Sequence, residues 1–265
     1  MTATPETVEP ILLRDDRDGV ATLTLNRPAA RNALSAALMS ELEDAFAAIA
    51  KDPGVKVVIL AANGLAFCAG HDLKEMRANP GRQNYEALFT QCSRLMMAIT
   101  RLSRPVIAKV HATATAAGCQ LVATCDLAVT ADGAHFATPG VNIGLFCSTP
   151  MVALSRAVGR KPAMEMLLTG APIDAAEALR LGLVNQAVPT EDLDTATWDL
   201  AATIAAKSPL TVATGKEAFY RQIDLDLDAA YAYASEVMTR NMLARDAEEG
   251  VDAFLEKRQP TWEGR

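Results

Sequence analysis

Short apolar runs recur along the first half of the chain at lengths that suit strands. Residues 20–25 alternate apolar positions with threonine, whereas residues 55–60 are a nearly continuous apolar run. Alternation is typical of a half-buried strand, and a continuous run is typical of a strand that is covered on both faces. Residues 106–110 and 127–130 form two further runs of strand length. The pattern therefore predicts a sheet with buried strands.

Helical periodicity separates these runs. Ser35 can cap a helix that extends to about Ala50 with its apolar residues on one face, and residues 85–102 form the next predicted helix. Strands that alternate with helices predict an α/β fold with right-handed crossovers.

The pattern turns helical after Thr149, with no polar linker that would mark a hinge. Asp174 can cap a helix over residues 175–181, and Gly182 can end it. The remaining predicted helices span residues 192–206, 209–222, 227–245 and 248–258.

Composition narrows the class of protein. Half of the 265 residues are apolar, which excludes a disordered chain, and the net charge of −7 argues against a nucleic-acid-binding face. No mainly apolar stretch reaches the ~20 residues that a membrane-spanning helix needs. Met1 to Pro10 is acidic and resembles neither a secretory signal nor an Arg-rich transit peptide, so we expect a cytoplasmic protein.

The cysteines and histidines do not form a metal-binding pattern. Five cysteines include no C-x-x-C pair, and the three histidines are scattered. An odd number of cysteines in a chain without a secretion signal indicates reduced thiols, so neither disulfides nor a structural zinc site is expected.

Two short stretches are candidates for chemistry. Residues 67–73 and 116–121 each follow a predicted strand, consist mostly of small residues and lead into a predicted helix. Unpaired N–H groups and the positive end of the helix dipole would point at the turn. Two such turns that face each other could hold a developing oxyanion between two backbone donors. Ordinary structural turns before helices would explain the same pattern.

A set of motifs, taken together, resembles the crotonase (enoyl-CoA hydratase/isomerase) superfamily. In chain order they are Asn26-Arg27-Pro28 with Asn32-Ala33-Leu34, residues 67–75, residues 104–110, residues 125–128 and residues 175–184. They run in the family's order from about residue 10 to the C-terminus. The resemblance implies a crotonase-like spiral of ββα units, with an acyl-CoA-binding core over residues 1–190 and a C-terminal helical trimerisation region over residues 191–265.

The resemblance also implies a chemistry. Proteins of this superfamily bind acyl-CoA or enoyl-CoA thioesters and stabilise a thioester enolate with two backbone N–H groups, which here would be those of His71 and Ala117. Coenzyme A enters as part of the substrate, and no separate cofactor or metal is implied. The expected substrate-binding and CoA-binding positions are Arg27, Ala29, Ala69, Gly70, Asp72, Leu73, Thr113, Ala116, Pro139, Ile143, Cys147, Ser148, Phe254 and Lys257.

Two positions depart from the pattern of the hydratases in this family. Those enzymes use two glutamates to hold a water molecule and move its protons, and the corresponding positions here are Gln120 and Gly140. A glutamine amide can orient water but cannot take a proton near neutral pH, and glycine can do neither. Efficient hydration by the standard route is therefore not expected.

Other groups could replace the carboxylates. Cys147 and Ser148 align near a loop where some relatives have a working aspartate, and the Cys147 thiol would need a pKa lowered by a helix N-terminus. Small lining and capping residues are the alternative interpretation. Asp72 is expected to cap a helix, and the His71 imidazole either takes part or leaves the chemistry to its backbone N–H.

Two kinds of function remain open. One is an enzyme of the hydratase/isomerase family that acts on an acyl-CoA through its enolate, and the other is a non-catalytic acyl-CoA-binding protein or structural subunit. A homotrimer or homohexamer is expected for either. Residues 115–121 and 136–150 resemble one animal subgroup of the superfamily.

Overall fold

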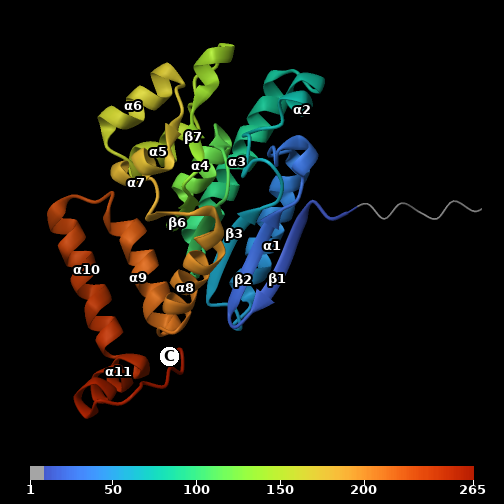
Figure 1. Cartoon of the computed structure of the whole chain (residues 1–265). Helices are drawn as coiled ribbons and strands as arrows, with labels where there is room; N and C mark the ends of the chain where they lie inside the picture. The colour runs from blue at the N-terminus through green and yellow to red at the C-terminus, as the bar shows by residue number, and fades with distance from the viewer. Residues whose placement is uncertain (1–8) are drawn as a thin grey trace, which may run out of the picture.

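The computed structural model describes residues 9–265, and its centre is a six-stranded sheet (Figure 1). The strand order is β1-β2-β3-β4-β6-β9, in which β1 pairs antiparallel with β2 and every later pair is parallel. The strands are β1 (Leu12–Arg17), β2 (Val20–Leu25), β3 (Val57–Ala62), β4 (Val106–Val110), β6 (Leu127–Ala131) and β9 (Gln186–Val188).

Each face of the sheet has its own apolar core, as alternation along β2 and β3 requires. On one face Leu23, Leu25 and Leu60 pack with buried residues of α1 (Ala36–Lys51), α3 (Arg82–Arg101) and α4 (Ala117–Thr124). On the other face Val20, Val57 and Ile59 pack with α8 (Leu193–Ala205). The sheet is thus covered on both sides, and the larger core lies under α3 and α4.

A small second sheet extends the fold beyond the carboxyl ends of the main strands. Its order is β5-β7-β8, with β5 (Ala114–Thr115) parallel to β7 (His135–Ala137) and β7 antiparallel to β8 (Ile173–Asp174). Short helices follow its strands or lie against them: η2 (Pro139–Ile143), α5 (Pro150–Ala157), α6 (Arg160–Thr169) and α7 (Ala175–Leu181). The remaining short helices are η1 (Pro28–Ala30), α2 (Leu73–Ala78) and η3 (Thr190–Asp192).

The last three helices project from the body of the molecule (Figure 1). They are α9 (Pro209–Gln222), α10 (Leu227–Met242) and α11 (Arg245–Glu256). Lys216 of α9 attaches this region to the sheet, because its buried Nζ donates to Asp126 Oδ2 at 2.6 Å. α8 packs on the sheet, whereas α9 to α11 extend beyond it. The expected division into a core over residues 1–190 and a helical region over residues 191–265 stays a prediction.

Most helices and central strands lie where the sequence predicts them. Ser35 caps α1 by accepting from the Leu38 N–H at 3.2 Å, and α7 is capped by Asp174 and ends at Gly182 with φ +84°. The predicted helix over residues 227–245 ends earlier, at Met242, and a new helix begins at Arg245.

Short and polar strands are the elements that the pattern does not predict. β1 has an exposed, charged sequence, and β5, β7, β8 and β9 have two or three residues each. Such strands are too short for a hydrophobic period and depend on pairing with neighbours.

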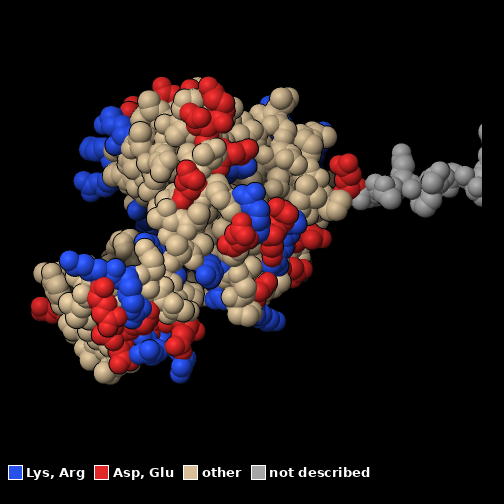
Figure 2. Space-filling model, turned by 60° about the horizontal axis from the view of Figure 1, so that its bottom comes forward, with Lys and Arg blue, Asp and Glu red and all other residues tan. Residues whose placement is uncertain are grey.

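The face drawn in Figure 2 has lysines and arginines interspersed with aspartates and glutamates. No helix within residues 9–265 is long and apolar enough to cross a membrane.

Candidate functional site

The two stretches singled out in the sequence lie against each other. Cys68 and Ala114 form a parallel bridge, and the Thr115 N–H donates to the Cys68 carbonyl at 2.9 Å. The Thr115 hydroxyl donates to the Ala69 carbonyl at 3.1 Å. The first turn, residues 67–72, is thereby held against the second turn, residues 114–118.

Two glycines allow this close approach. A Cβ added at Gly118 would lie 2.1 Å from the Cys68 carbonyl oxygen, so no larger residue fits between the two backbones. Gly70 has φ +93°, and a Cβ there would lie 3.3 Å from the Ala117 nitrogen. The residue that follows Gly70, His71, is therefore next to the start of α4.

The backbone N–H groups of His71 and Ala117 have no hydrogen-bond acceptor within residues 9–265, whereas those of Asp72 and Ala116 do. The Asp72 N–H donates to the Leu34 carbonyl at 3.1 Å, and the Ala116 N–H donates to the Ala137 carbonyl at 2.9 Å. Ala117 is the first residue of α4, where the helix dipole is positive. Two uncommitted donors thus lie on adjoining turns.

The backbone before α4 is strained at Ala116, which has φ +51° and ψ −118°. This region suits glycine, and an alanine there costs about 1–3 kcal/mol. Ala117, in contrast, is not among the residues with positive φ, so an alanine is compatible with its place at the start of the helix.

Polar side chains of the first turn are engaged in holding it. Asp72 caps α2 by accepting from the Lys74 and Glu75 N–H groups, and it pairs with Arg27 at 3.1 Å. Burial alone would raise the pKa of Asp72, but the hydrogen bonds from Arg27 and the helix amides outweigh it and keep this pKa below its usual range. Glu75 accepts from the Ala36 N–H at 3.1 Å. The expected capping role of Asp72 is therefore found in the structure.

The His71 imidazole is partly buried between the first turn and α3. It packs edge-on against Phe89, with ring centroids 5.6 Å apart and an interplanar angle of 83°. Its Nε2 is buried and has no hydrogen-bond partner among the described residues. Burial lowers the pKa of His71 to about 4, so the ring is neutral near pH 7.

We expect the free energy of unfolding to fall as the pH is lowered from 6.5 to 4. His71 has a pKa of about 4 when folded and about 6.5 when unfolded, so the unfolded chain binds more protons in this window. The difference between these two pKa values corresponds to roughly 3 kcal/mol. Urea unfolding at several pH values, compared between the native protein and His71→Phe, measures it. Identical pH dependence in both proteins would contradict the assignment.

Gln120 lies within the core beneath the second turn. Its side chain is 4% exposed, and its Oε1 accepts a long contact of 3.9 Å from the thiol of Cys92 on α3. Cys92 is three residues beyond Phe89, so His71 and Gln120 contact the same face of α3 one turn apart.

A reactive thiol at Cys147 would need a lowered pKa, but its pKa is raised. It is 8% exposed, and burial raises its pKa more than a backbone hydrogen bond from Gly140 lowers it. Although α5 begins at Pro150, desolvation dominates, which favours the alternative interpretation of Cys147 as a small lining residue. The Ser148 hydroxyl donates to the Phe146 carbonyl at 3.3 Å and is exposed, which fits a local turn.

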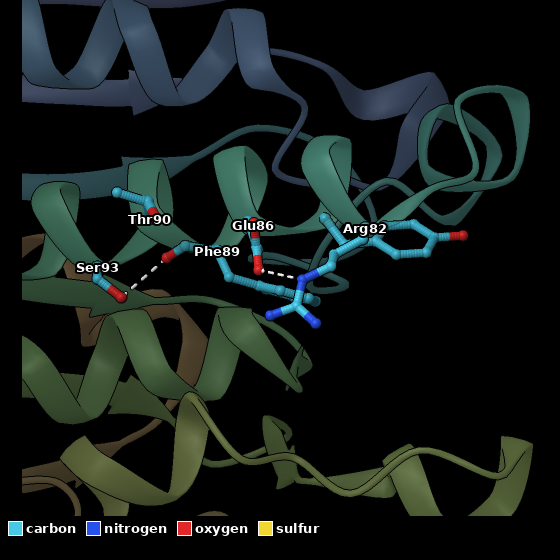
Figure 3. A pocket seen from close by; sticks show the side chains of 6 residues that line it. Arg82, Glu86, Phe89, Thr90 and Ser93 are labelled. Carbon is cyan, nitrogen blue, oxygen red and sulfur yellow. Dashed lines mark hydrogen bonds and ion pairs between the residues drawn. The ribbon is translucent and has the colours of Figure 1, made fainter.

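An open cavity of about 740 Å³ lies along α3, and one of its lining residues, Phe89, contacts the His71 ring. Its lining residues are Arg82, Tyr85, Glu86, Phe89, Thr90 and Ser93. Arg82 Nε donates to Glu86 Oε1 at 2.7 Å, which pairs the two charges on the cavity wall (Figure 3).

The remaining expected positions fall into two groups. Arg27, Ala69, Thr113, Ala116 and Pro139 lie on or beside the two turns; for example, the Phe67 N–H donates to the Thr113 carbonyl at 3.0 Å, and Pro139 follows Thr138 at the end of β7. Ala29, Leu73 and Ile143 are exposed around them.

Phe254 and Lys257 do not lie with the other residues in a single chain. They belong to the end of α11, at the opposite end of the molecule from α2 (Figure 1), and the Phe254 side chain is 82% exposed. Their expected contact with coenzyme A would require a neighbouring copy of the chain and stays a prediction.

Three residues of the site were not identified from the sequence: Phe89, Cys92 and Thr138. The first two are on the α3 face that turns toward the site, and their spacing of three is the signal that could have found them. The Thr138 hydroxyl is buried without a partner in the described structure, which no sequence pattern indicates.

Comparison with known proteins supports the resemblance. A family model described as "Enoyl-CoA hydratase/isomerase" matches residues 15–265. The protein of Rattus norvegicus named "Enoyl-CoA hydratase domain-containing protein 3, mitochondrial" is 47% identical over 98% of this chain and 87% of its own length.

Two solved structures are similar throughout. The crystal structure of an enoyl-CoA hydratase from Mycobacterium smegmatis is 58% identical, with a TM-score of 0.94 over 96% of this chain and 99% of that one. The crystal structure of human enoyl coenzyme A hydratase domain-containing protein 3 is 47% identical, with a TM-score of 0.93 over 96% and 100% of the two chains. The expected α/β fold class and the similarity to an animal subgroup are thus confirmed.

The cytoplasmic location expected from the sequence is wrong on this comparison. The relatives from rat, mouse, Xenopus laevis and human are all named as mitochondrial proteins. The expectation rested mainly on residues 1–10, of which residues 1–8 lie outside the part of the chain that the structure describes.

Proposed function

Because this chain belongs to the enoyl-CoA hydratase/isomerase family, we propose that it binds acyl-CoA thioesters and stabilises the thioester enolate with the N–H groups of His71 and Ala117. The observation that supports this most directly is the pair of uncommitted backbone donors on adjoining turns. Donors of this kind act where negative charge develops, because they are already oriented and need no reorganisation. Coenzyme A would enter with the substrate, without a further cofactor.

Hydration itself is expected to be slow. The positions proposed to replace the two hydratase glutamates are Gln120, which is buried and contacts Cys92, and Gly140, which has no side chain. Each positioned acid or base contributes about 10²–10⁴-fold to a rate. The site therefore retains electrostatic stabilisation and lacks the usual proton-transfer groups.

A second candidate function is acyl-CoA binding with no turnover, as a binding protein or structural subunit. The buried, unreactive thiol of Cys147 and the engaged carboxylates of Asp72 and Glu75 favour it, because none of them is free to move a proton. The two candidates share the same ligand and differ only in turnover.

Assembly as a homotrimer or homohexamer is part of the proposal. The apolar side chains that α9 to α11 expose support it, since exposed patches of this kind are typical of interfaces. They include Phe219, Leu227, Tyr231, Met238, Met242, Phe254 and Leu255.

The proposed function is tested with crotonyl-CoA. We expect calorimetric titration to show binding. The absorbance of the bound enoyl-thioester should shift to the red, because the two amides polarise its carbonyl. The hydration rate should be at least ~10²-fold below that of an efficient hydratase. Ala117→Pro removes one donor at the first position of a helix, where proline is tolerated, and should abolish the red shift.

Leu227→Pro is the matched control, because it makes the same change at the exposed first residue of α10. It should leave binding and the red shift as they are. Absence of crotonyl-CoA binding by the native protein would refute the proposed function, and hydration at the rate of an efficient hydratase would refute the argument from Gln120 and Gly140.

A further inference from the structure

Only two buried side-chain oxygen or nitrogen atoms within residues 9–265 have no hydrogen-bond partner: His71 Nε2 and Thr138 Oγ1. Both lie beside the adjoining turns. His71 is in the first turn, and Thr138 follows Ala137, whose carbonyl accepts from the Ala116 N–H of the second turn. Buried polar groups in native proteins are nearly always hydrogen-bonded, so each exception needs an explanation. Their placement indicates a ligand that completes these bonds.

Of the two, His71 has the chemistry of a base. A neutral imidazole has one nitrogen with a free lone pair, whereas a threonine hydroxyl has no useful basicity near neutral pH. The pKa of about 4 for His71 is close to that of a free glutamate side chain, about 4.3. The ring is therefore neutral near pH 7 and can accept a proton.

The other acid–base candidates around the turns are already engaged. Asp72 accepts from the start of α2 and pairs with Arg27, and Glu75 accepts from the Ala36 N–H. Burial raises the pKa of Cys147, and Gln120 cannot take a proton. His71 Nε2 is the atom among these groups that is buried and has no hydrogen-bond partner within residues 9–265.

The position of the ring suits a role next to the thioester. His71 packs on Phe89 of α3, and Gln120, three residues beyond Ala117 on α4, contacts Cys92 one turn along the same face of α3. Side chains three residues apart on a helix lie about 5–6 Å apart at Cβ, so the His71 ring and the Gln120 amide contact neighbouring side chains of α3. Phe89 also lines the open cavity along α3.

We propose that His71 Nε2 removes a proton from the α-carbon of a bound acyl-CoA thioester, an inference that rests on the proposed function. The α C–H bond breaks, and its electron pair forms a double bond to the carbonyl carbon. The carbonyl π electrons move to the oxygen, which the His71 and Ala117 amides hold. The proton bonds to the Nε2 lone pair and gives an imidazolium, and reprotonation of the α-carbon restores the neutral ring. Saturated acyl thioesters with an α-hydrogen are the substrate class.

The test is deuterium incorporation into the α-carbon of butyryl-CoA in D₂O, followed by mass spectrometry, with calorimetric binding of butyryl-CoA in parallel. The native protein should incorporate deuterium. His71→Gln retains hydrogen bonding but cannot accept the proton, and His71→Phe retains the packing on Phe89. Both should lose about 10²–10⁴-fold in exchange rate while the Kd changes less than about threefold, because the backbone amide of residue 71 remains.

His135→Gln is the matched control, because His135 is an exposed histidine on β7 that should leave exchange unchanged. Native-like exchange by His71→Gln, or binding of butyryl-CoA by the native protein without exchange, would overturn the role of His71 and leave the proposed binding function intact. No binding of butyryl-CoA by the native protein would overturn the proposed function itself.

Discussion

Gly118→Ala is expected to abolish acyl-CoA binding and to lower the free energy of unfolding by about 3 kcal/mol or more. The new Cβ would lie 2.1 Å from the Cys68 carbonyl oxygen, which is backbone and cannot rotate away. Forcing extra atoms into a packed core typically costs ~1–3 kcal/mol, and a contact with fixed backbone lies at the upper end. The two turns must separate, and the amides of His71 and Ala117 separate with them.

The reverse substitution two residues earlier is the matched control. Ala116→Gly relieves the backbone strain at φ +51° and should raise the free energy of unfolding by about 1 kcal/mol, after the extra chain entropy of glycine is subtracted. Urea unfolding and calorimetric titration with crotonyl-CoA on both variants measure the two effects. Native stability and binding in Gly118→Ala would show that the turns do not need this close approach.

Local signals predicted most of the elements that position the site. The caps at Ser35 and Asp174 and the stop at Gly182 are properties of a few neighbouring residues, and the helices begin and end there. The small residues of the two turns likewise indicate close backbone approach, which the structure contains. Such features depend on residues within one turn of the chain.

The candidate chemistry was harder to predict because it depends on partners far away in the sequence. The burial that lowers the pKa of His71 depends on packing against Phe89, eighteen residues away. Burial of Cys147 acts in the opposite direction and raises the pKa of its thiol. No local pattern indicates whether a side chain will be desolvated. The sequence therefore left His71 and Cys147 open as alternatives, and the structure separates them through burial.

The role of Asp126 in stability also depends on partners that are far away in the sequence. In the sequence Asp126 only precedes the apolar run of residues 127–130, whereas in the structure its carboxylate accepts from Lys216, Tyr220 and the Val106 N–H. Lys216 is ninety residues away, and its side chain is 6% exposed. Burial lowers the pKa of Lys216, and the Asp126 charge opposes this shift. The charge on this lysine thus depends on Asp126.

Asp126→Ala is therefore expected to lower the free energy of unfolding by roughly 3–5 kcal/mol, because it leaves a buried ammonium without its counter-ion. Lys216 would keep only the carbonyls of Ile99 and Arg104 as acceptors. Adding Lys216→Met should recover part of the loss, since no unpaired charge then remains. Urea unfolding of the single and double variants measures the coupling.

Asp194→Ala is the matched control for this pair. Asp194 accepts from Lys109 at 2.6 Å, the same distance as in the buried pair, but its side chain is 83% exposed. Water and salt screen such a pair, so its loss should cost less than ~1 kcal/mol. Equal losses for Asp126→Ala and Asp194→Ala would refute the argument, because distance and not burial would then determine the cost. A large loss confined to Asp126→Ala would identify this buried pair as the attachment of α9, and with it the projecting helices, to the sheet.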